Sequence, residues 1–276
     1  PKSDGSVDQA MLYLLDYFKI ENAFKVGGAQ AIAAMAYGTE SISKMDKIFG
    51  PGNQYVTAAK QLVSLDNTAI DMPAGPSEVA IIADETANPG FVAADFLSQL
   101  EHGADSQAII FTDSKKLLDA TIIEIEKQQA VLSRKKLIEK AAQKSSIVLL
   151  ENKEDILNFV NDYAPEHLII STKENKFYIE NIKNAGSVFI GNYTPESAGD
   201  YASGTNHTLH TNGAAKAYSD LSTLSFMKAI TFQEISKTGI KKLGKTIEIL
   251  AETEQLQAHK NAVTIRLKQI ENEKLS

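Results

Sequence analysis

Residues 78 to 112, EVAIIADETANPGFVAADFLSQLEHGADSQAIIFT, contain two short apolar runs on either side of a segment with helical signals. The runs Glu78 to Ala83 and Gln107 to Thr112 have the length and apolar content of buried strands. Between them, Asn88 precedes a proline, which predicts a capped helix that begins there and ends near Glu101. A strand, a helix and a second strand of these lengths predict one unit of a parallel sheet.

The same alternation extends in both directions along the chain. Downstream, strands are predicted at residues 146–150, 167–171 and 187–190, and helices at 114–143, 153–162 and 176–183. Upstream, the pattern predicts helices at residues 7–20, 29–37 and 54–65 and a short strand at 23–26. Strands that alternate with helices indicate a parallel sheet with helices on its faces, so the predicted fold class is α/β.

Two parts of the chain depart from this alternation. Residues 193–213 are rich in Gly, Ser, Thr and Asn, and a loop of that length in a compact domain is more often functional than not. From Asp220 onward no strand is predicted, and two amphipathic helices are expected at residues 235–250 and 255–270. Candidate domain boundaries fall near residues 72–77 and near Asp220.

The composition is that of an ordinary soluble globular protein, with 43% hydrophobic and 23% charged residues. A formal net charge of -7 argues against a nucleic-acid partner, because phosphate-binding surfaces carry a basic excess. The chain has no apolar run of the about 20 residues that span a bilayer, and its first residues contain no signal-peptide core. We therefore expect a cytoplasmic protein without a membrane partner.

Cysteine is absent, so any zinc ion must take nitrogen and oxygen ligands, and only five histidines are present. Gln99 and His102 lie three residues apart near the end of a predicted helix, so both side chains share one face and could reach a common ion. On spacing alone the simpler interpretation is stronger: His102 is favoured at a helix C-terminus, which Gly103 ends.

Glu166 and His167 are adjacent, directly after Pro165 and at the start of a predicted strand. A carboxylate beside an imidazole provides two proton acceptors with different intrinsic pKa values, as general acid–base chemistry requires. Ligands of parallel sheets usually bind at the carboxyl ends of the strands, so topology does not favour this turn, which enters a strand. A catalytic pair and a solvated turn are equally good interpretations of these residues alone.

The long segment at residues 193–213 holds Asp200, His207 and His210, which supply candidate oxygen and nitrogen ligands for a metal. The alternative is a polar surface loop in which Asp200 makes a local turn hydrogen bond, and for His210 this alternative is favoured. Nearer the C-terminus, Glu254 and His259 lie at the start of the last predicted helix, where a solvated helix is the simpler interpretation.

Gly27 and Gly28 follow the predicted strand at residues 23–26 and precede a helix, as a nucleotide-binding turn would. The pattern is not the dinucleotide-binding G-x-G-x-x-G, so close packing of the helix on the sheet is the simpler interpretation. Phosphate binding at this helix N-terminus stays open.

Taken together, seven ordered segments resemble the histidinol dehydrogenase family and extend over nearly the whole chain. They are VGGAQAIA (26–33), KIFGPGN (47–53), IDMPAGPSE (70–78), DFLSQLEHG (95–103), NDYAPEHL (161–168), GDYASGTNH (199–207), and Glu254 with His259. Because so many matches occur in order, the resemblance is specific.

The resemblance implies two Rossmann-like parallel-sheet domains followed by a C-terminal helical tail. Residues 1–78 would form the domain on the NAD side, residues 79–221 the main α/β domain with the zinc and catalytic residues, and residues 222–276 a tail exchanged in a homodimer. Chains of the family extend further at the N-terminus. We therefore expect the first domain to be incomplete and this chain alone to have little dehydrogenase activity.

The resemblance also implies one zinc ion per subunit, held by Gln99, His102, Asp200 and His259. In the family the metal binds the imidazole and amino groups of L-histidinol, so it would orient the substrate rather than make hydroxide. The implied substrate contacts are Ser77, Gln99, His102, His167, Asp200, Glu254 and His259, and the implied NAD contacts are Gln30 and Asn53. His207 lies in a matching motif and is given a supporting role.

The implied reaction is the NAD-dependent oxidation of L-histidinol through histidinal to L-histidine, the last steps of histidine biosynthesis. His167 is expected to act as the base in the first oxidation, and Glu166 to activate water in the second. Glu254 and His259 would complete the site of the partner subunit, which accounts for their distance in sequence from the other residues. A closed, dry site would retain the reactive aldehyde.

Two other functions are consistent with the same residues. One is a paralogous dehydrogenase that oxidises another amino alcohol, although Glu254 and the complete ligand set favour histidinol. The other is a non-catalytic, zinc-binding dimeric remnant, which the retention of both Glu166 and His167 argues against.

Overall fold

The computed structural model describes residues 2, 4–72 and 75–273, so residues 73 and 74 of the first predicted boundary lie outside the described residues. The chain forms two compact units, Pro1–Phe226 and Met227–Ser276. The predicted divisions at residues 1–78 and 79–221 both fall in the first unit, so their separation into two domains stays a prediction.

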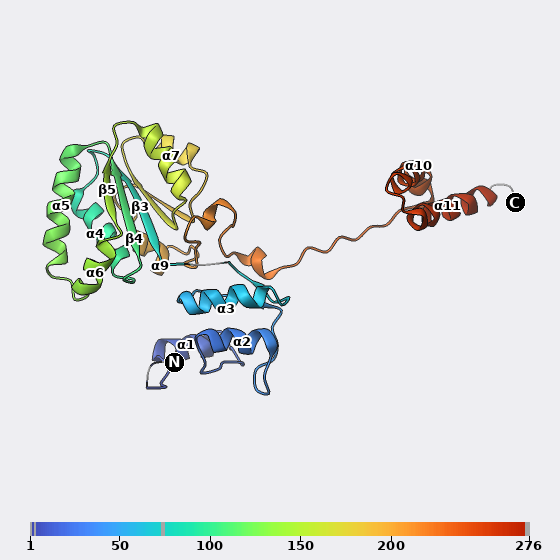
Figure 1. Cartoon of the computed structure of the whole chain (residues 1–276), viewed down its shortest axis with the longest axis horizontal. Coiled ribbons are helices and arrows are strands. Elements are labelled where there is room, and N and C mark those ends of the chain that lie inside the picture. The colour runs from blue at the N-terminus through green and yellow to red at the C-terminus, as the bar shows by residue number, and fades with distance from the viewer. Residues whose placement is uncertain (1, 3, 73–74, 274–276) are drawn as a thin grey trace. The chain divides into compact units, whose positions relative to one another are not determined.

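A five-stranded parallel sheet forms the centre of the first unit (Figure 1). Its strands are β3 (Glu78–Ala83), β4 (Gln107–Thr112), β5 (Ser146–Leu149), β6 (His167–Ser171) and β7 (Ser187–Ile190), in the spatial order β5-β4-β3-β6-β7. In the register of the central strand, Val79 lies opposite Ala108 on one side and His167 on the other. The predicted parallel sheet is therefore confirmed.

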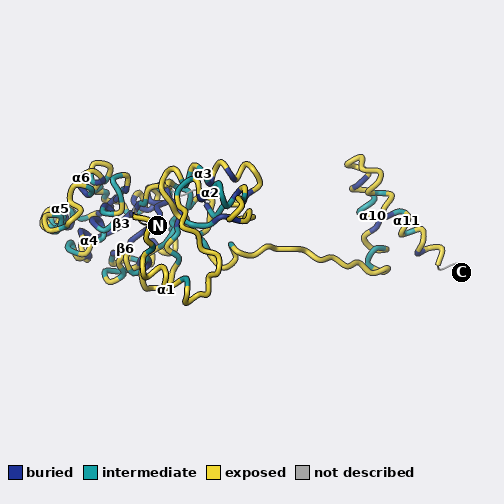
Figure 2. The backbone as a smooth tube through the Cα atoms, turned by 90° about the horizontal axis from the view of Figure 1, so that it is seen from below, coloured by how far each residue is buried: buried dark blue, intermediate teal, exposed yellow. Residues whose placement is uncertain are grey.

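Helices cover both faces of this sheet, because the apolar side chains of its central strand point alternately to one face and to the other. Their bounds are α4 (Pro89–Leu100), α5 (Lys115–Gln129), α6 (Lys135–Ala142), α7 (Lys153–Tyr163) and α8 (Asn175–Asn181). Val79 and Ile81 pack in a core with residues of α4, α5 and α6, whereas Ala80 and Ile82 pack in a second core with residues of α7 and α8. Successive side chains of a strand point to opposite faces, so β3 supplies both cores and is buried throughout (Figure 2).

Three local predictions differ from the structure. The helical stretch predicted at residues 114–143 is two helices, because the chain turns at residues 130–134 and α6 packs on α4. Residues 23–26 form no strand, because no described segment pairs with them. The loop predicted at residues 193–213 contains the short helix α9 (Glu196–Tyr201), which Pro195 precedes.

The N-terminal part of the first unit contains short elements. They are α1 (Gln9–Tyr17), α2 (Ala29–Tyr37), β1 (Lys47–Ile48), α3 (Gln54–Ser64) and β2 (Ala69–Ile70), with β1 and β2 paired in parallel. Residues of α2, β1, α3 and β2 form a small core, whereas α1 has no buried residue. Lys60 and Asp71 form a buried ion pair beneath the turn that follows β1. Lys60 donates to the Gly50 carbonyl at 2.9 Å and Asp71 accepts from the Gly50 N–H at 2.7 Å, so the pair fixes this turn.

The predicted helical tail is confirmed by α10 (Lys237–Thr253) and α11 (Gln257–Asn272), which pack on each other in the second unit. Gly244 permits their close approach, because a Cβ atom there would lie 2.8 Å from Leu267 Cδ1. Two short 3-10 helices, η1 (Ala214–Lys216) and η2 (Thr223–Phe226), precede the exposed residues 227–236. Among the described residues, no helix has the length and apolar character needed to cross a bilayer.

Candidate active site

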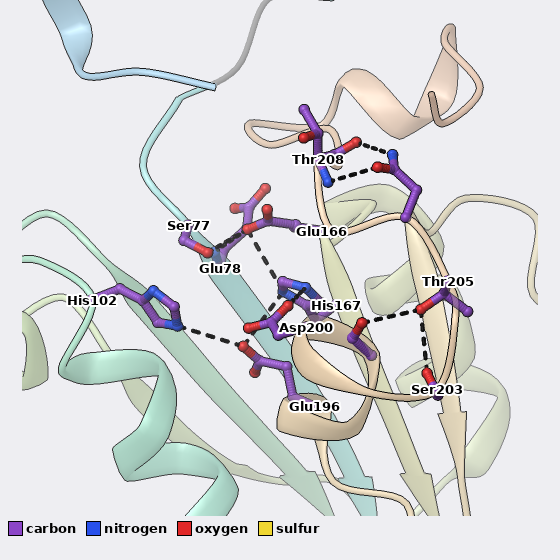
Figure 3. Close-up of polar contacts among 12 residues, drawn as sticks. Ser77, Glu78, His102, Glu166, His167, Glu196, Asp200, Ser203, Thr205 and Thr208 are labelled. Carbon is purple, nitrogen blue, oxygen red and sulfur yellow. Dashed lines mark hydrogen bonds and ion pairs between the residues drawn. The ribbon is translucent and has the colours of Figure 1, made fainter. Parts of the chain in front are cut away.

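The candidate site lies at the amino ends of the strands, whereas ligands of parallel sheets usually bind at the carboxyl ends. Ser77 precedes β3, Glu166 precedes β6, and His167 is the first residue of β6. The helix α4 links the carboxyl end of β3 to the amino end of β4, so its C-terminal end, with Gln99 and His102, returns to this same edge. The chain thus brings together residues that lie far apart in the sequence (Figure 3).

The turn that carries Glu166 is fixed by its backbone. Helix α7 ends at Ala164, which adopts the left-handed conformation with φ of 53°, and Pro165 cannot continue the helix. The Gly186 N–H then donates to the Pro165 carbonyl at 2.9 Å. A Cβ atom on Gly186 would lie 2.6 Å from the Glu166 carbonyl oxygen, so this close approach requires glycine.

Glu166 is buried, and one of its carboxylate oxygens accepts two hydrogen bonds. Ser77 Oγ donates to Glu166 Oε2 at 2.5 Å, and the Glu78 backbone N–H donates to the same oxygen at 3.0 Å. Burial raises the pKa of Glu166 to about 7, and the charges of Glu78 and Asp200 raise it as well, whereas the two hydrogen bonds lower it. A carboxyl group with a pKa near neutrality is suited to general acid–base work.

His167 is buried beside three carboxylates. Its Nδ1 lies 3.6 Å from Glu166 Oε2 and 3.8 Å from Glu196 Oε1, and its Nε2 lies 3.9 Å from Asp200 Oδ1. Neither ring nitrogen makes a hydrogen bond of ordinary geometry with the described residues. Burial lowers the pKa of His167 to about 4, although the Asp200 charge opposes this effect. At neutral pH the ring is therefore uncharged and able to accept a proton.

The short helix α9 places Glu196 and Asp200 in the same site. The two residues are four apart, so they share one face of the helix. Helix α9 approaches β7 closely at Gly199, where a Cβ atom would lie 2.7 Å from the Phe189 ring. Burial raises the pKa of Glu196 to about 9, and the charges of Asp200 and Glu166 add to this effect.

Three of these side chains form a group that fits a metal ion. Ligand atoms of His102, Glu196 and Asp200 all lie within 4.8 Å of one another. Gln99, on the last turn of α4, is fully buried, and neither its amide oxygen nor its amide nitrogen has a hydrogen-bond partner among the described residues. An oxygen and nitrogen donor set of this kind is compatible with zinc.

A cavity of about 170 Å³ lies between the catalytic candidates. It is lined by Ser77, His102, Glu166, His167, Asp200 and His207, together with residues of the turn after β1 and of the segment 208–211. The structure thus brings together five of the predicted substrate and catalytic residues and also His207. No lysine or arginine is among the described residues that line it.

A larger cavity of about 710 Å³ shares Ser77 and His102 with the first and is also lined by Asn53. The carboxamide oxygen of Asn53 caps α3 by accepting hydrogen bonds from the N–H groups of Tyr55 and Val56. Gln30, the other predicted NAD contact, is exposed on α2 and is not among the described residues that line either cavity.

Three remaining candidates lie elsewhere in the structure. Glu254 follows α10 and His259 lies in α11, both in the second unit. His210 was interpreted as part of a polar surface loop, but it is 1% exposed, with Nε2 3.3 Å from Asp220 Oδ1. The ring therefore lies in the interior of the first unit rather than in solvent, and burial lowers the pKa of His210.

Sequence reasoning missed Glu196 and the buried Glu78. The signal for Glu196 was its spacing of four residues from Asp200 after a proline, which indicates a short helix with two carboxylates on one face. Glu78 was interpreted only as the start of a strand. It accepts a hydrogen bond from the Asn212 N–H at 2.6 Å and so ties the segment after His207 to the sheet.

Comparison with known proteins identifies similar chains along the whole length. The family model described as histidinol dehydrogenase matches residues 1–267. Histidinol dehydrogenase of Bacteroides fragilis (strain YCH46) is 58% identical over 270 residues, which are 98% of this chain and 63% of that protein. The Pseudoalteromonas translucida protein of the same name is 52% identical over 274 residues, 99% of this chain and 63% of that protein.

A solved structure is similar as well. The crystal structure of histidinol dehydrogenase from Elizabethkingia anophelis matches with a TM-score of 0.94 and 54% sequence identity, and the match covers 96% of this chain and 61% of that one. This likeness agrees with the mixed α/β architecture described above. The chain therefore spans somewhat less than two thirds of the length of the relatives that it matches.

Proposed function

Because this chain belongs to the histidinol dehydrogenase family, we propose that it takes part in the NAD-dependent oxidation of L-histidinol, through histidinal, to L-histidine. This reaction completes histidine biosynthesis. The observation that supports the proposal best is the convergence of Glu166, His167, His102 and Asp200 on one cavity. The side chains offer metal ligands and two proton acceptors within a few ångströms of each other, as a two-step dehydrogenase needs.

Zinc would be held by Gln99, His102 and Asp200, with the partner subunit's His259 as a further ligand. Bound there, zinc supplies a Lewis acid that orients the imidazole and amino nitrogens of L-histidinol. The carboxylate of Asp200 balances the charge of the cation, and burial of Gln99 excludes water from its amide. The Ser77 hydroxyl donates a hydrogen bond to Glu166, and Ser77 also lines the cavity, where it would contact the substrate.

In the first oxidation His167 is the base. Its uncharged ring accepts the hydroxyl proton of the alcohol as the C–H bond of the same carbon breaks, and NAD, when bound, would supply the hydride acceptor. The aldehyde histidinal would remain in the cavity, which the buried side chains of Glu166 and His167 help to line. NAD would occupy the larger neighbouring cavity beside Asn53.

In the second oxidation Glu166 activates water. The carboxylate accepts one proton of the water molecule as its oxygen bonds to the aldehyde carbon, and protonated His167 returns its proton to the aldehyde oxygen. His167 then accepts a hydroxyl proton of the resulting hydrate as its C–H bond breaks, which yields the carboxylic acid, and a second NAD would supply the hydride acceptor. The raised pKa of Glu166, about 7, allows the group to take and release a proton near neutral pH.

We also propose a homodimer in which α10 and α11 of one subunit serve the site of the other. The partner subunit's His259 would bind the metal, and the partner subunit's Glu254 would bind the imidazole of the substrate. The division of the chain into two compact units with an exposed connection supports such an exchange, since the second unit has its own packing.

The proposal is tested by NADH formation from L-histidinol with zinc. Both this chain and a fusion to the segment that its Bacteroides fragilis relative carries beyond the match are assayed, because the chain spans 63% of that relative. We expect the fusion to form two NADH per histidinol and to stop when zinc is chelated. His167→Asn, which keeps the size and polarity of the side chain, serves as the inactive control. No NADH from the zinc-loaded fusion, or faster turnover of another amino alcohol, would contradict the proposal.

A further inference from the structure

We propose that the protein has a second ligand site, at the carboxyl ends of its strands, which binds the vicinal hydroxyl groups of an uncharged ribose. The site is a cavity of about 220 Å³ beyond the ends of β3, β4 and β6. Strand β3 has six residues and rises by about 3.3 Å per residue, so this cavity lies on the order of 17 Å from the candidate active site at the amino ends. The second site is independent of the dehydrogenase reaction proposed above.

The topology of the sheet places this cavity where parallel sheets usually bind ligands. In the spatial order β5-β4-β3-β6-β7, the chain extends from β3 to β5 on one side and starts again at β6 on the other side. The carboxyl ends of β3 and β6 therefore flank a switch point, and sheets of this order bind nucleotides in such a crevice. In those sheets an acidic residue that follows the first helix hydrogen-bonds a ribose hydroxyl. Asp113, directly after α4 and β4, lines the cavity in the corresponding place.

A buried hydroxyl group without a partner gives a second, independent observation. Tyr178 on α8 is 4% exposed and lines the cavity, and its hydroxyl makes no hydrogen bond with any residue that the structure describes. Burial raises the pKa of this hydroxyl, and the charges of Asp113 and Asp84 raise it further, so the group is protonated and lies near both carboxylates. Because buried polar groups are normally hydrogen-bonded, an oxygen atom of a ligand is the partner that Tyr178 lacks.

The two carboxylates of the cavity have different roles. Asp84 Oδ1 accepts a hydrogen bond from the Thr86 N–H at 2.9 Å, and Asp84 Oδ2 accepts one from the Lys173 N–H at 2.6 Å. Asp84 therefore fixes the loops that follow β3 and β6. The Asp113 carboxylate accepts no hydrogen bond from another residue in the described part of the chain, so it is available to a ligand.

The chemistry of the cavity selects an uncharged ligand with hydroxyl groups. The loop after β3, DETAN (84–88), has two acidic residues and no glycine, so it lacks the backbone cradle that holds a phosphate. A metal ion does not fit either, because among the described residues the carboxylates here form no group of three with ligand atoms within 4.8 Å. Two neighbouring hydroxyls fit, since one can donate to Asp113 while the other accepts from Tyr178.

The lysines that line the cavity do not make it an anion site. Lys153 Nζ lies 2.5 Å from Glu174 Oε2 and 4.5 Å from the centre of the Phe177 ring, so its charge is already balanced. Lys173 is exposed, and its backbone N–H is bound to Asp84. The volume of about 220 Å³ is below the about 300–1,000 Å³ of pockets for drug-sized ligands, so the cavity would enclose a single sugar ring.

The alternative is a tyrosine of the core whose hydroxyl is bound to water in a surface depression. The two interpretations predict different results for sugar binding. Isothermal titration calorimetry is performed with adenosine, methyl β-D-ribofuranoside, 2′-deoxyadenosine and adenosine 5′-monophosphate. We expect adenosine or the ribofuranoside to bind, 2′-deoxyadenosine to bind at least about tenfold more weakly because it lacks one hydroxyl, and the phosphate to weaken binding.

Two variants and one control locate the site. Asp113→Ala is expected to lose about tenfold or more in affinity, since hydrogen bonds to charged groups are the stronger ones, and Tyr178→Phe about 3–10-fold. Asp119→Ala, at an exposed carboxyl on α5, is the matched control and should bind as the wild type does. Tyr178→Phe keeps the ring in the core and removes a hydroxyl without a partner in the protein, so its unfolding temperature should equal that of the wild type or exceed it.

Each outcome supports the site or overturns it. Binding of adenosine alone identifies a nucleoside as the ligand, and equal binding of the ribofuranoside identifies the sugar. Equal affinity of the wild type and Asp113→Ala for adenosine would place its binding elsewhere, for example in the cavity beside Asn53, and overturn the proposal. Equal binding of 2′-deoxyadenosine, tighter binding of the phosphate, or no binding of either sugar would also overturn it. The function proposed above would stand in each case.

Discussion

Replacing Glu166 by glutamine is predicted to stabilise the metal-free protein at high pH and not at low pH. Glu166 is 7% exposed, and its pKa is raised from 4.5 to about 7, chiefly by burial. The folded protein therefore binds a proton that the unfolded chain has released, so wild-type stability falls as the pH rises from 4.5 through 7. A glutamine side chain does not titrate, so this loss of stability is absent in Glu166→Gln. Its amide oxygen can still accept hydrogen bonds from Ser77 Oγ and the Glu78 N–H.

The magnitude follows from the size of the shift. One pKa unit corresponds to about 1.4 kcal/mol, and integration of the shift between pH 5 and pH 8 gives about 2.5 kcal/mol. The free energy of unfolding of Glu166→Gln, relative to wild type, should therefore rise by about this amount between the two pH values. Urea denaturation of both proteins with a chelator present measures it.

Glu180→Gln is the control, because it makes the same substitution at a side chain that is 60% exposed on α8. Its difference from wild type should change less between the two pH values than that of Glu166→Gln. If the difference in the free energy of unfolding between Glu166→Gln and wild type does not change between pH 5 and pH 8, burial does not raise the pKa of Glu166.

Three further experiments test the packing of α9, the packing of the core and the roles of the two catalytic candidates. Gly199→Ala places a Cβ atom 2.7 Å from the Phe189 ring, so α9 must move. The free energy of unfolding, measured by urea denaturation, should fall by about 1–3 kcal/mol, and zinc binding should weaken. Unchanged zinc affinity would contradict this. Ile81→Ala in the fully buried strand β3 should cost about 2–5 kcal/mol in the same assay, and a loss under 1 kcal/mol would show that the core is not packed as described. In the fusion, His167→Asn should form no NADH, because the first oxidation lacks its base. Glu166→Gln should form one NADH per histidinol and release histidinal, which an aldehyde trap detects. Formation of two NADH by Glu166→Gln would show that Glu166 does not activate the water.

Most of the sheet could be predicted from local sequence because its signals are local. The central strand at residues 78–83 is apolar on both faces, and Asn88 before a proline determines where α4 begins. These features need no knowledge of the rest of the chain. The break between α5 and α6 carries no glycine or proline, and it arises because α6 must pack on α4.

The candidate site was less accessible to local reasoning. Glu166 and His167 were weighed as a pair because they are adjacent, but their burial follows from the neighbouring strand and from Gly186, which the sequence does not place beside them. Glu196 went unnoticed because its segment was interpreted as a loop. Glu196 lies near His102 because distant parts of the chain meet at the same edge of the sheet, which no short sequence pattern predicts.

The zinc assignment is tested by anomalous diffraction at the zinc edge from crystals of this protein grown with zinc and L-histidinol. We expect one strong peak at the amino ends of β3 and β6, at bonding distances of about 2.0–2.2 Å from His102 Nε2 and an Asp200 carboxylate oxygen. A zinc ion bound elsewhere, with His102 and Asp200 free of it, would contradict the assignment of this cavity as the catalytic centre.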